Sequence, residues 1–214
     1  MTVFLTHNRV KLALHTLRYG QGPNLLLLHA LGDHAPTETP LEFASWPGAI
    51  HALDFTGHGA STIPAGGGYT AEVLMADVDA ALSMTGPATI AGRGLGAYIA
   101  VLIAGARPEL VRGTILQDGA GLAGGGQQPG PIVVRGVPGR TTAPDPFALV
   151  ELGSDIRPPE YVARFAELAA ENSGLATPIF VCCKSRPDWL KAVLATKGAV
   201  ETTIEIALAE CVRR

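Results

Sequence analysis

Apolar residues fall in two patterns along the chain, and together they predict a sheet flanked by helices. Short apolar or alternating runs are typical of strands, and apolar residues three and four apart are typical of amphipathic helices. The predicted strands are residues 10–18, 25–29, 49–55, 88–91, 113–117, 179–183 and 202–208. The predicted helices are residues 70–85, 97–106, 158–172 and 189–195. This alternation predicts an α/β fold with a mostly parallel central sheet, helices on both faces, and a site at the carboxyl ends of the strands.

One stretch departs from this alternation. Residues 119–146 are rich in Gly and Pro and show no clear period, so we expect an irregular excursion there, before the helix over 158–172. No linker or internal repeat divides the chain. We therefore expect a single domain over residues 1–214.

Composition excludes several classes of protein. The chain has 214 residues, of which 47% are hydrophobic and 16% charged, a balance that argues against disorder. The formal net charge is −3 and no basic run stands out, so we expect no nucleic-acid binding. The most apolar run, residues 25–31, is far shorter than the roughly 20 residues of a membrane helix. The start also lacks the apolar core of a signal peptide. We therefore expect a soluble, cytoplasmic protein without membrane contact.

Cysteine and histidine give no sign of a disulfide framework or a metal site. The cysteines are Cys182, Cys183 and Cys211, an odd number with two adjacent members, and adjacent cysteines rarely bridge each other. We interpret Cys182 and Cys183 as buried small apolar residues. The six histidines lack the spacing of metal ligands. We expect neither a metal nor a cofactor.

Three segments carry recognisable motifs. Residues 25–34 read LLLLHALGDH, residues 54–61 read DFTGHGAS, and residues 88–97 read ATIAGRGLGA. In this order they resemble the oxyanion loop, the D-x-x-G-H-G-x-S turn and the G-x-S-x-G nucleophile elbow of the α/β-hydrolase superfamily. The resemblance is continuous from about Leu25 to Gly121 and weaker beyond. It implies the α/β-hydrolase fold, with residues 119–172 as a reduced cap region.

The resemblance also implies that the catalytic machinery is incomplete. Gly94 stands where the family has its nucleophilic serine. The family's general base follows the last strand, but no histidine occurs after His58. A serine hydrolase needs both groups, so the resemblance implies a degenerate triad without serine hydrolase activity. Asp118 and Asp188 are candidate residual acids, and the catalytic residues stay unknown.

A binding pocket can remain when the catalytic side chains are absent, because the family's oxyanion donors are backbone N–H groups. By the resemblance these belong to Leu31 and Leu95, and Leu95 also lies at a helix N-terminus, which favours negative charge. The candidate ligand-binding residues are His29, Leu31, His34, Arg93, Gly94 and Leu95. We also interpret His29 and His58 as residues that organise loops. The expected ligand is a small apolar, acyl, carbonyl or carboxylate molecule.

Three hypotheses about function stay open. The first is a non-catalytic protein that binds a small molecule or a partner, such as a second copy in a homodimer that closes the pocket. The second is a non-covalent hydrolase or lyase that uses the oxyanion pocket and an acid such as Asp33, Asp118 or Asp188. The third is a dinucleotide binder, because Gly92, Gly94 and Ala97 also fit the pattern G-x-G-x-x-A and Asp118 ends the next strand. The two upstream motifs, which a dinucleotide domain does not need, argue against the third hypothesis.

Overall fold

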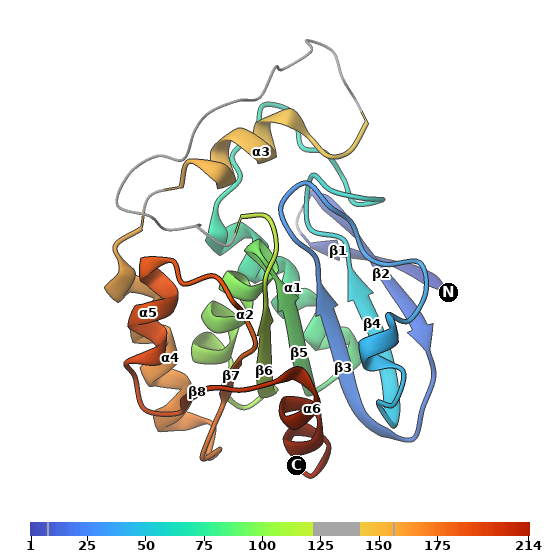
Figure 1. Ribbon diagram of the computed structural model, residues 1–214. Helices are drawn as coiled ribbons and strands as arrows, with labels where there is room; N and C mark the ends of the chain where they lie inside the picture. The colour runs from blue at the N-terminus through green and yellow to red at the C-terminus, as the bar shows by residue number, and fades with distance from the viewer. Residues whose placement is uncertain (8, 122–141, 156) are drawn as a thin grey trace.

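The computed structural model describes residues 1–7, 9–121, 142–155 and 157–214. This part of the chain contains an eight-stranded sheet in the order β1-β2-β4-β3-β5-β6-β7-β8 (Figure 1). Its strands are β1 (Thr2–His7), β2 (Val10–Arg18), β3 (Gly22–Leu28), β4 (Gly48–Leu53), β5 (Ala88–Arg93), β6 (Val111–Gln117), β7 (Ile179–Val181) and β8 (Ala199–Glu201). The β1–β2 and β2–β4 pairs are antiparallel and the other neighbouring pairs are parallel. The predicted mostly parallel sheet is confirmed.

Helices cover both faces of the sheet. They are α1 (Ala71–Thr85), α2 (Leu95–Ala106), α3 (Pro146–Gly153), α4 (Pro159–Asn172), α5 (Asp188–Leu194) and α6 (Ile204–Val212), with a short 3₁₀ turn η1 (Leu41–Phe43). Successive side chains of a strand point to opposite faces. Accordingly Leu26 and Leu28 of β3 pack in the core formed with α1, α2, α4 and α5. Leu25 and Leu27 pack in a smaller core with η1 and α6.

Side-chain caps set where several helices begin. Thr70 is the N-cap of α1, and its hydroxyl accepts a hydrogen bond from the amide of Val73. Thr203 accepts one from Ile206 at the start of α6. Each cap pairs a backbone N–H that has no partner within the helix.

The end of the chain differs from the prediction. Residues 202–208 were predicted as the last strand, but β8 ends at Glu201 and α6 begins at Ile204. The alternating run Thr-Thr-Ile-Glu-Ile-Ala-Leu imitates a strand over a short window. The buried residues are instead Ala207, Leu208 and Cys211, which recur at helical spacing. A helix therefore buries these three side chains on one face.

The region predicted as an irregular excursion is described in part. Residues 122–141 lie outside the described residues, and the helix expected over 158–172 is present as α4. Helix α3, which was not predicted, begins at Pro146 behind the N-cap Asp145. It lies beyond the carboxyl ends of the strands (Figure 1). The side chain of Leu149 there comes close to Gly32. Strand β1 was also not predicted.

Within the described ranges, no helix combines the length and the apolar character that crossing a membrane requires.

Candidate functional site

Gly94 forms a sharp turn between β5 and α2. Its backbone has φ 55° and ψ −117°, a conformation that strains any residue with a side chain. A Cβ atom at this position would lie 2.1 Å from the carbonyl oxygen of Ala120 and 2.6 Å from the carbonyl carbon of Gly119. Neighbouring backbone therefore fills the space in which a nucleophile's side chain would stand. Both the conformation and the available space require glycine.

The two expected oxyanion donors do lie together. The backbone N–H groups of Leu31 and Leu95 converge on a single oxygen atom, at N···O distances of 3.1 and 3.0 Å. That oxygen is the carbonyl of Ala120, which follows β6. The chain itself thus occupies the position at which a hydrolase would stabilise a developing negative charge. A ligand at this point would first have to displace the Ala120 carbonyl.

The turn that reads D-x-x-G-H-G-x-S ties loops together. The Asp54 carboxylate accepts hydrogen bonds from the amides of Ala35 (2.7 Å) and Ala60 (2.8 Å), and its Oδ2 lies 3.0 Å from Nε2 of His15. The Ser61 hydroxyl donates to the Asp54 carbonyl at 2.6 Å and accepts from the amide of Ala13 at 2.9 Å. These contacts join the loop after β3 to β2 and β4, so the turn serves structure.

His29 and His58 organise the same loops. Nδ1 of His29 bonds the Ala30 carbonyl (2.8 Å), and its Nε2 accepts from the amide of Phe55 (3.1 Å). His58 bonds the Thr56 carbonyl through Nδ1 and accepts from the amide of Gly32 through Nε2. Burial, aided by the neighbouring His58, lowers the pKa of His29 to about 4, and burial also lowers the pKa of His58. Both imidazoles are neutral near pH 7, and the loop-organising interpretation is confirmed.

The structure separates the two candidate acids. Asp118 follows β6, and its carboxylate accepts hydrogen bonds from the amides of Lys184 (2.6 Å) and Ser185 (3.0 Å). Partial burial opposes its ionisation, but these hydrogen bonds outweigh burial and lower its pKa. Asp188 begins α5, is 66% exposed and forms an ion pair with Lys191 at 2.9 Å. Asp118 directly precedes Gly119, whose backbone lies against Gly94 at the elbow, whereas Asp188 lies on the outer surface.

Thr202 and Thr203 stand where the resemblance places the general base. They connect β8 to α6 and are the whole connection between these elements. Thr203 is committed to capping α6. Neither residue has a side chain that accepts a proton near neutral pH.

A partly enclosed cavity of about 260 Å³ lies on the sheet face that carries η1. We call it the inner cavity. Its apolar lining includes Leu27 and Ala91 from the sheet and Pro40 and Phe43 from the η1 segment. Its other lining residues are Leu28, His29, Asp33, His34, Pro36, Glu42, Arg93 and Gln117.

An open groove of about 670 Å³ adjoins this cavity along the carboxyl ends of β5 to β8. We call it the outer groove. It is lined by Asp118, Cys182, Cys183, Lys184, Glu201, Thr202, Thr203, Ile204 and Glu205, together with three residues that also line the inner cavity. The three shared residues are Glu42, Arg93 and Gln117. They form the rim between the two hollows.

The predicted ligand-binding residues thus divide into two groups. His29, His34 and Arg93 line the inner cavity. Leu31, Gly94 and Leu95 gather at the elbow, around the Ala120 carbonyl. Arg93 is exposed, and its side chain makes no hydrogen bond or ion pair with the residues that the structure describes.

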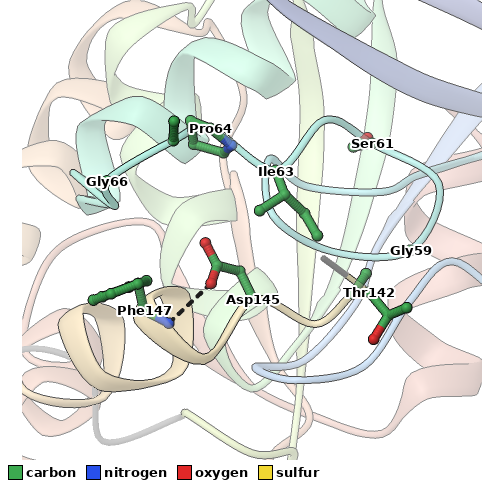
Figure 2. A pocket seen from close by; sticks show the side chains of 10 residues that line it. Gly59, Ser61, Ile63, Pro64, Gly66, Thr142, Asp145 and Phe147 are labelled. Atoms are coloured by element: carbon green, nitrogen blue, oxygen red, sulfur yellow. Dashed lines mark hydrogen bonds between the residues drawn. The ribbon is translucent and has the colours of Figure 1, made fainter. Parts of the chain in front are cut away.

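A third hollow, of about 730 Å³, lies between the loop after β4 and the start of α3 (Figure 2). Ile63, Pro64 and Phe147 line it, with the buried Asp145 between them. The Asp145 carboxylate accepts hydrogen bonds from the Tyr69 hydroxyl (2.6 Å) and from the amide of Phe147 (3.1 Å). This acid caps α3 and holds the loop, so it is committed to structure.

Cys183 is buried as predicted, whereas Cys182, which was also predicted to be buried, is only partly buried. All three cysteines are free thiols, and Cys183 and Cys211 are buried. Burial raises the pKa of Cys182 and of Cys211 to about 11 and that of Cys183 to about 12. Among the described residues, no group of three or more His, Cys, Asp or Glu side chains is placed to hold a metal ion.

Three residues at the site were not predicted. Ala120 fills the expected oxyanion position, and Glu42 and Gln117 complete the rim. A signal for Ala120 exists in the sequence, since Gly119 and Gly121 flank it and small residues permit close backbone approach. Glu42 reaches the rim through a loop that carries no motif, so its position depends on the tertiary structure.

Comparison with known proteins gives likeness in structure alone. No protein-family model matches the chain, and no curated protein matches it in sequence. A deformylase of N-formylmaleamic acid from Pseudomonas putida superposes with a TM-score of 0.68 at 14% identity, over 95% of this chain and 92% of the other.

Two further crystal structures are similar over almost the whole chain. A thioesterase domain from the curacin biosynthetic pathway gives a TM-score of 0.61 at 16% identity, over 99% of this chain and 97% of that domain. A bacterial membrane phospholipase A gives 0.60 at 18% identity, over 100% and 87%. At these identities the likeness establishes the fold.

Proposed function

We propose that this chain, which has the α/β-hydrolase fold, is a non-catalytic protein that binds a small molecule. One observation carries the proposal: the Ala120 carbonyl accepts hydrogen bonds from both oxyanion donors while backbone fills the place of a side chain at position 94. An acyl transfer needs a nucleophile at that place and free donors beside it. Here both requirements are blocked by the same short segment.

The general base and the acid support the same interpretation. Thr202 and Thr203 occupy the expected position of the base, and Thr203 caps a helix. Asp118 is engaged by two backbone amides, and no histidine is among the described residues that line its groove. The resemblance therefore covers the backbone around the catalytic site and does not include the nucleophile or the general base.

The other two hypotheses have less support. A non-covalent hydrolase or lyase would need the oxyanion pocket, and the Ala120 carbonyl fills it. A dinucleotide binder would need Asp118 free to accept from a ribose hydroxyl, but the amides of Lys184 and Ser185 already engage it. Binding in the inner cavity requires neither group.

Ester hydrolysis and covalent labelling test the proposal. The purified chain is assayed against short- and medium-chain p-nitrophenyl esters and treated with a fluorophosphonate probe. We expect no saturable release above background and no labelling. A variant carrying Cys182→Ala and Cys183→Ala controls for slow reaction of thiols. Saturable release that survives in this variant, or labelling at any residue, would overturn the proposal.

A further inference from the structure

The inner cavity has the size and the apolar floor of a site for one small side chain. Leu27, Ala91 and Phe43 are 5%, 3% and 3% exposed, and all three line the cavity. The volume of about 260 Å³ lies below the usual 300–1,000 Å³ of pockets for drug-sized molecules. An apolar group of modest size therefore fits the floor.

The rim carries one positive and one negative side chain, and these two do not form an ion pair with each other. Arg93 and Glu42 line both the inner cavity and the outer groove. Within the described part of the chain, neither side chain forms a hydrogen bond or an ion pair. A guanidinium binds a carboxylate in a bidentate manner, and a carboxylate binds an ammonium group. A ligand with both charges can satisfy both side chains.

Gln117, the third rim residue, adds an acceptor without a partner. Its Oε1 atom is buried and accepts no hydrogen bond from the described residues. Such atoms are rare in folded proteins, and a donor group of a bound ligand would satisfy this one. An ammonium group has three donors, so it can serve Glu42 and, after a small rotation of the amide, Gln117 as well.

We infer that the inner cavity and its rim bind a zwitterionic α-amino acid with an apolar side chain. This inference rests on the proposed binding function and names its ligand class. The carboxylate pairs with Arg93, the ammonium group with Glu42 and Gln117, and the side chain lies on Leu27 and Phe43. A simple carboxylate fits less well, because Glu42 and the nearby Asp33 repel it. An uncharged apolar molecule leaves both rim charges unpaired.

Calorimetric titration with three related probes tests the ligand class. The probes are L-phenylalanine, 3-phenylpropionate, which lacks the ammonium group, and phenethylamine, which lacks the carboxylate. We expect L-phenylalanine to bind at least tenfold more tightly than either analogue. Equal binding of 3-phenylpropionate, or no binding of L-phenylalanine and L-leucine, would overturn the inference.

Substitutions on the rim test where the ligand binds. Arg93→Gln should weaken L-phenylalanine at least tenfold and leave phenethylamine unchanged, because only the carboxylate loses its partner. Glu42→Gln should weaken L-phenylalanine and spare 3-phenylpropionate. Arg112→Gln and Glu109→Gln are matched controls, since both residues are exposed at the opposite end of β6, and they should change nothing. Rim variants that behave like these controls would contradict the assigned site.

The two proposals fail in different experiments. Ester turnover or covalent labelling overturns the non-catalytic function, whatever the titrations show. Absence of amino-acid binding in a chain that is also inert toward esters overturns the ligand class and leaves the non-catalytic function standing.

Discussion

The carbonyl oxygen of Ala120 lies 3.0 Å from the amide nitrogen of Leu95, at the N-terminus of the helix that follows the elbow. A second hydrogen bond, from the amide of Leu31, holds the same oxygen. This pairing leaves neither backbone donor without a partner, and buried unpaired N–H groups are costly. The segment that closes the site therefore also stabilises it.

Substitution of Gly94 should destabilise the fold without restoring chemistry. Gly94→Ser places a Cβ atom against the Ala120 carbonyl and forces a side chain into a strained conformation. We expect a loss of at least about 2 kcal/mol in the free energy of unfolding, measured by urea denaturation. We also expect no fluorophosphonate labelling of this variant.

A matched control separates strain from steric overlap at Gly94. Gly174 also has a positive φ, 71°, but a Cβ atom there would meet nothing within 4 Å. Gly174→Ala should therefore cost about 1 kcal/mol, from backbone strain alone. If Gly94→Ala costs no more than Gly174→Ala, the Ala120 segment does not fill the space at the elbow.

Ser61, the last residue of the D-x-x-G-H-G-x-S turn, should matter for stability. Ser61→Ala removes a hydroxyl that bonds the Asp54 carbonyl and the amide of Ala13, and it leaves a buried N–H unpaired. We expect a loss of about 1–3 kcal/mol in the free energy of unfolding. Ser83→Ala, which removes an exposed helical hydroxyl, should stay within about 0.5 kcal/mol. Equal effects of the two substitutions would contradict the structural role of the turn.

Asp77 should make stability decrease as the pH rises from about 4 to about 7. It is 1% exposed, and burial raises its pKa from near 3.8 to about 7, against the opposing effect of hydrogen bonds from Thr56. The folded state therefore holds a proton that the unfolded state releases, and this contribution to stability is lost as the pH rises through the folded pKa. Asp77→Asn keeps both hydrogen bonds to Thr56 possible and removes the titration.

Denaturation at several pH values checks this prediction. The stability of Asp77→Asn relative to the unmodified chain should increase between pH 4.5 and pH 8. A difference that stays constant over this range would show that Asp77 is ionised in the fold throughout.

His29 should act in the opposite direction. Burial lowers its pKa to about 4, below the ordinary 6.5, so its contribution is fully present above pH 6.5 and is lost as the pH falls toward 4. NMR titration of the imidazole, assigned with a His29→Asn variant, should show no protonation between pH 8 and pH 5.5. A midpoint near 6.5 would contradict its burial between Ala30 and Phe55.

The parallel core of the fold was accessible from the sequence because its signals are local. Strands β3, β4, β5 and β6 are apolar runs bounded by turns, and Thr70 is an N-cap residue at the start of α1. The run from Thr202 to Leu208 was wrongly predicted as a strand because that prediction also used only a local pattern. Its alternation is short, and the helix is decided by which side chains the sheet can bury.

The site was accessible in part. The elbow at Gly94 and the pairing of Leu31 with Leu95 were expected from the resemblance of the three motifs to the α/β-hydrolase superfamily. The identity of the acceptor between them depends on how the segment after β6 folds back. The rim formed by Glu42, Arg93 and Gln117 joins three distant segments, so no local pattern contains it.

The two-residue connection between β8 and α6 bears on which mutations this chain can accept. Introducing a proton acceptor there would remove the threonine that starts α6 or require an insertion, while a serine at position 94 would need the segment at Ala120 to move away. Each step taken alone weakens the fold and gains no turnover. Stepwise mutation under selection for stability would therefore eliminate the intermediates on the way to a Ser–His pair in this frame.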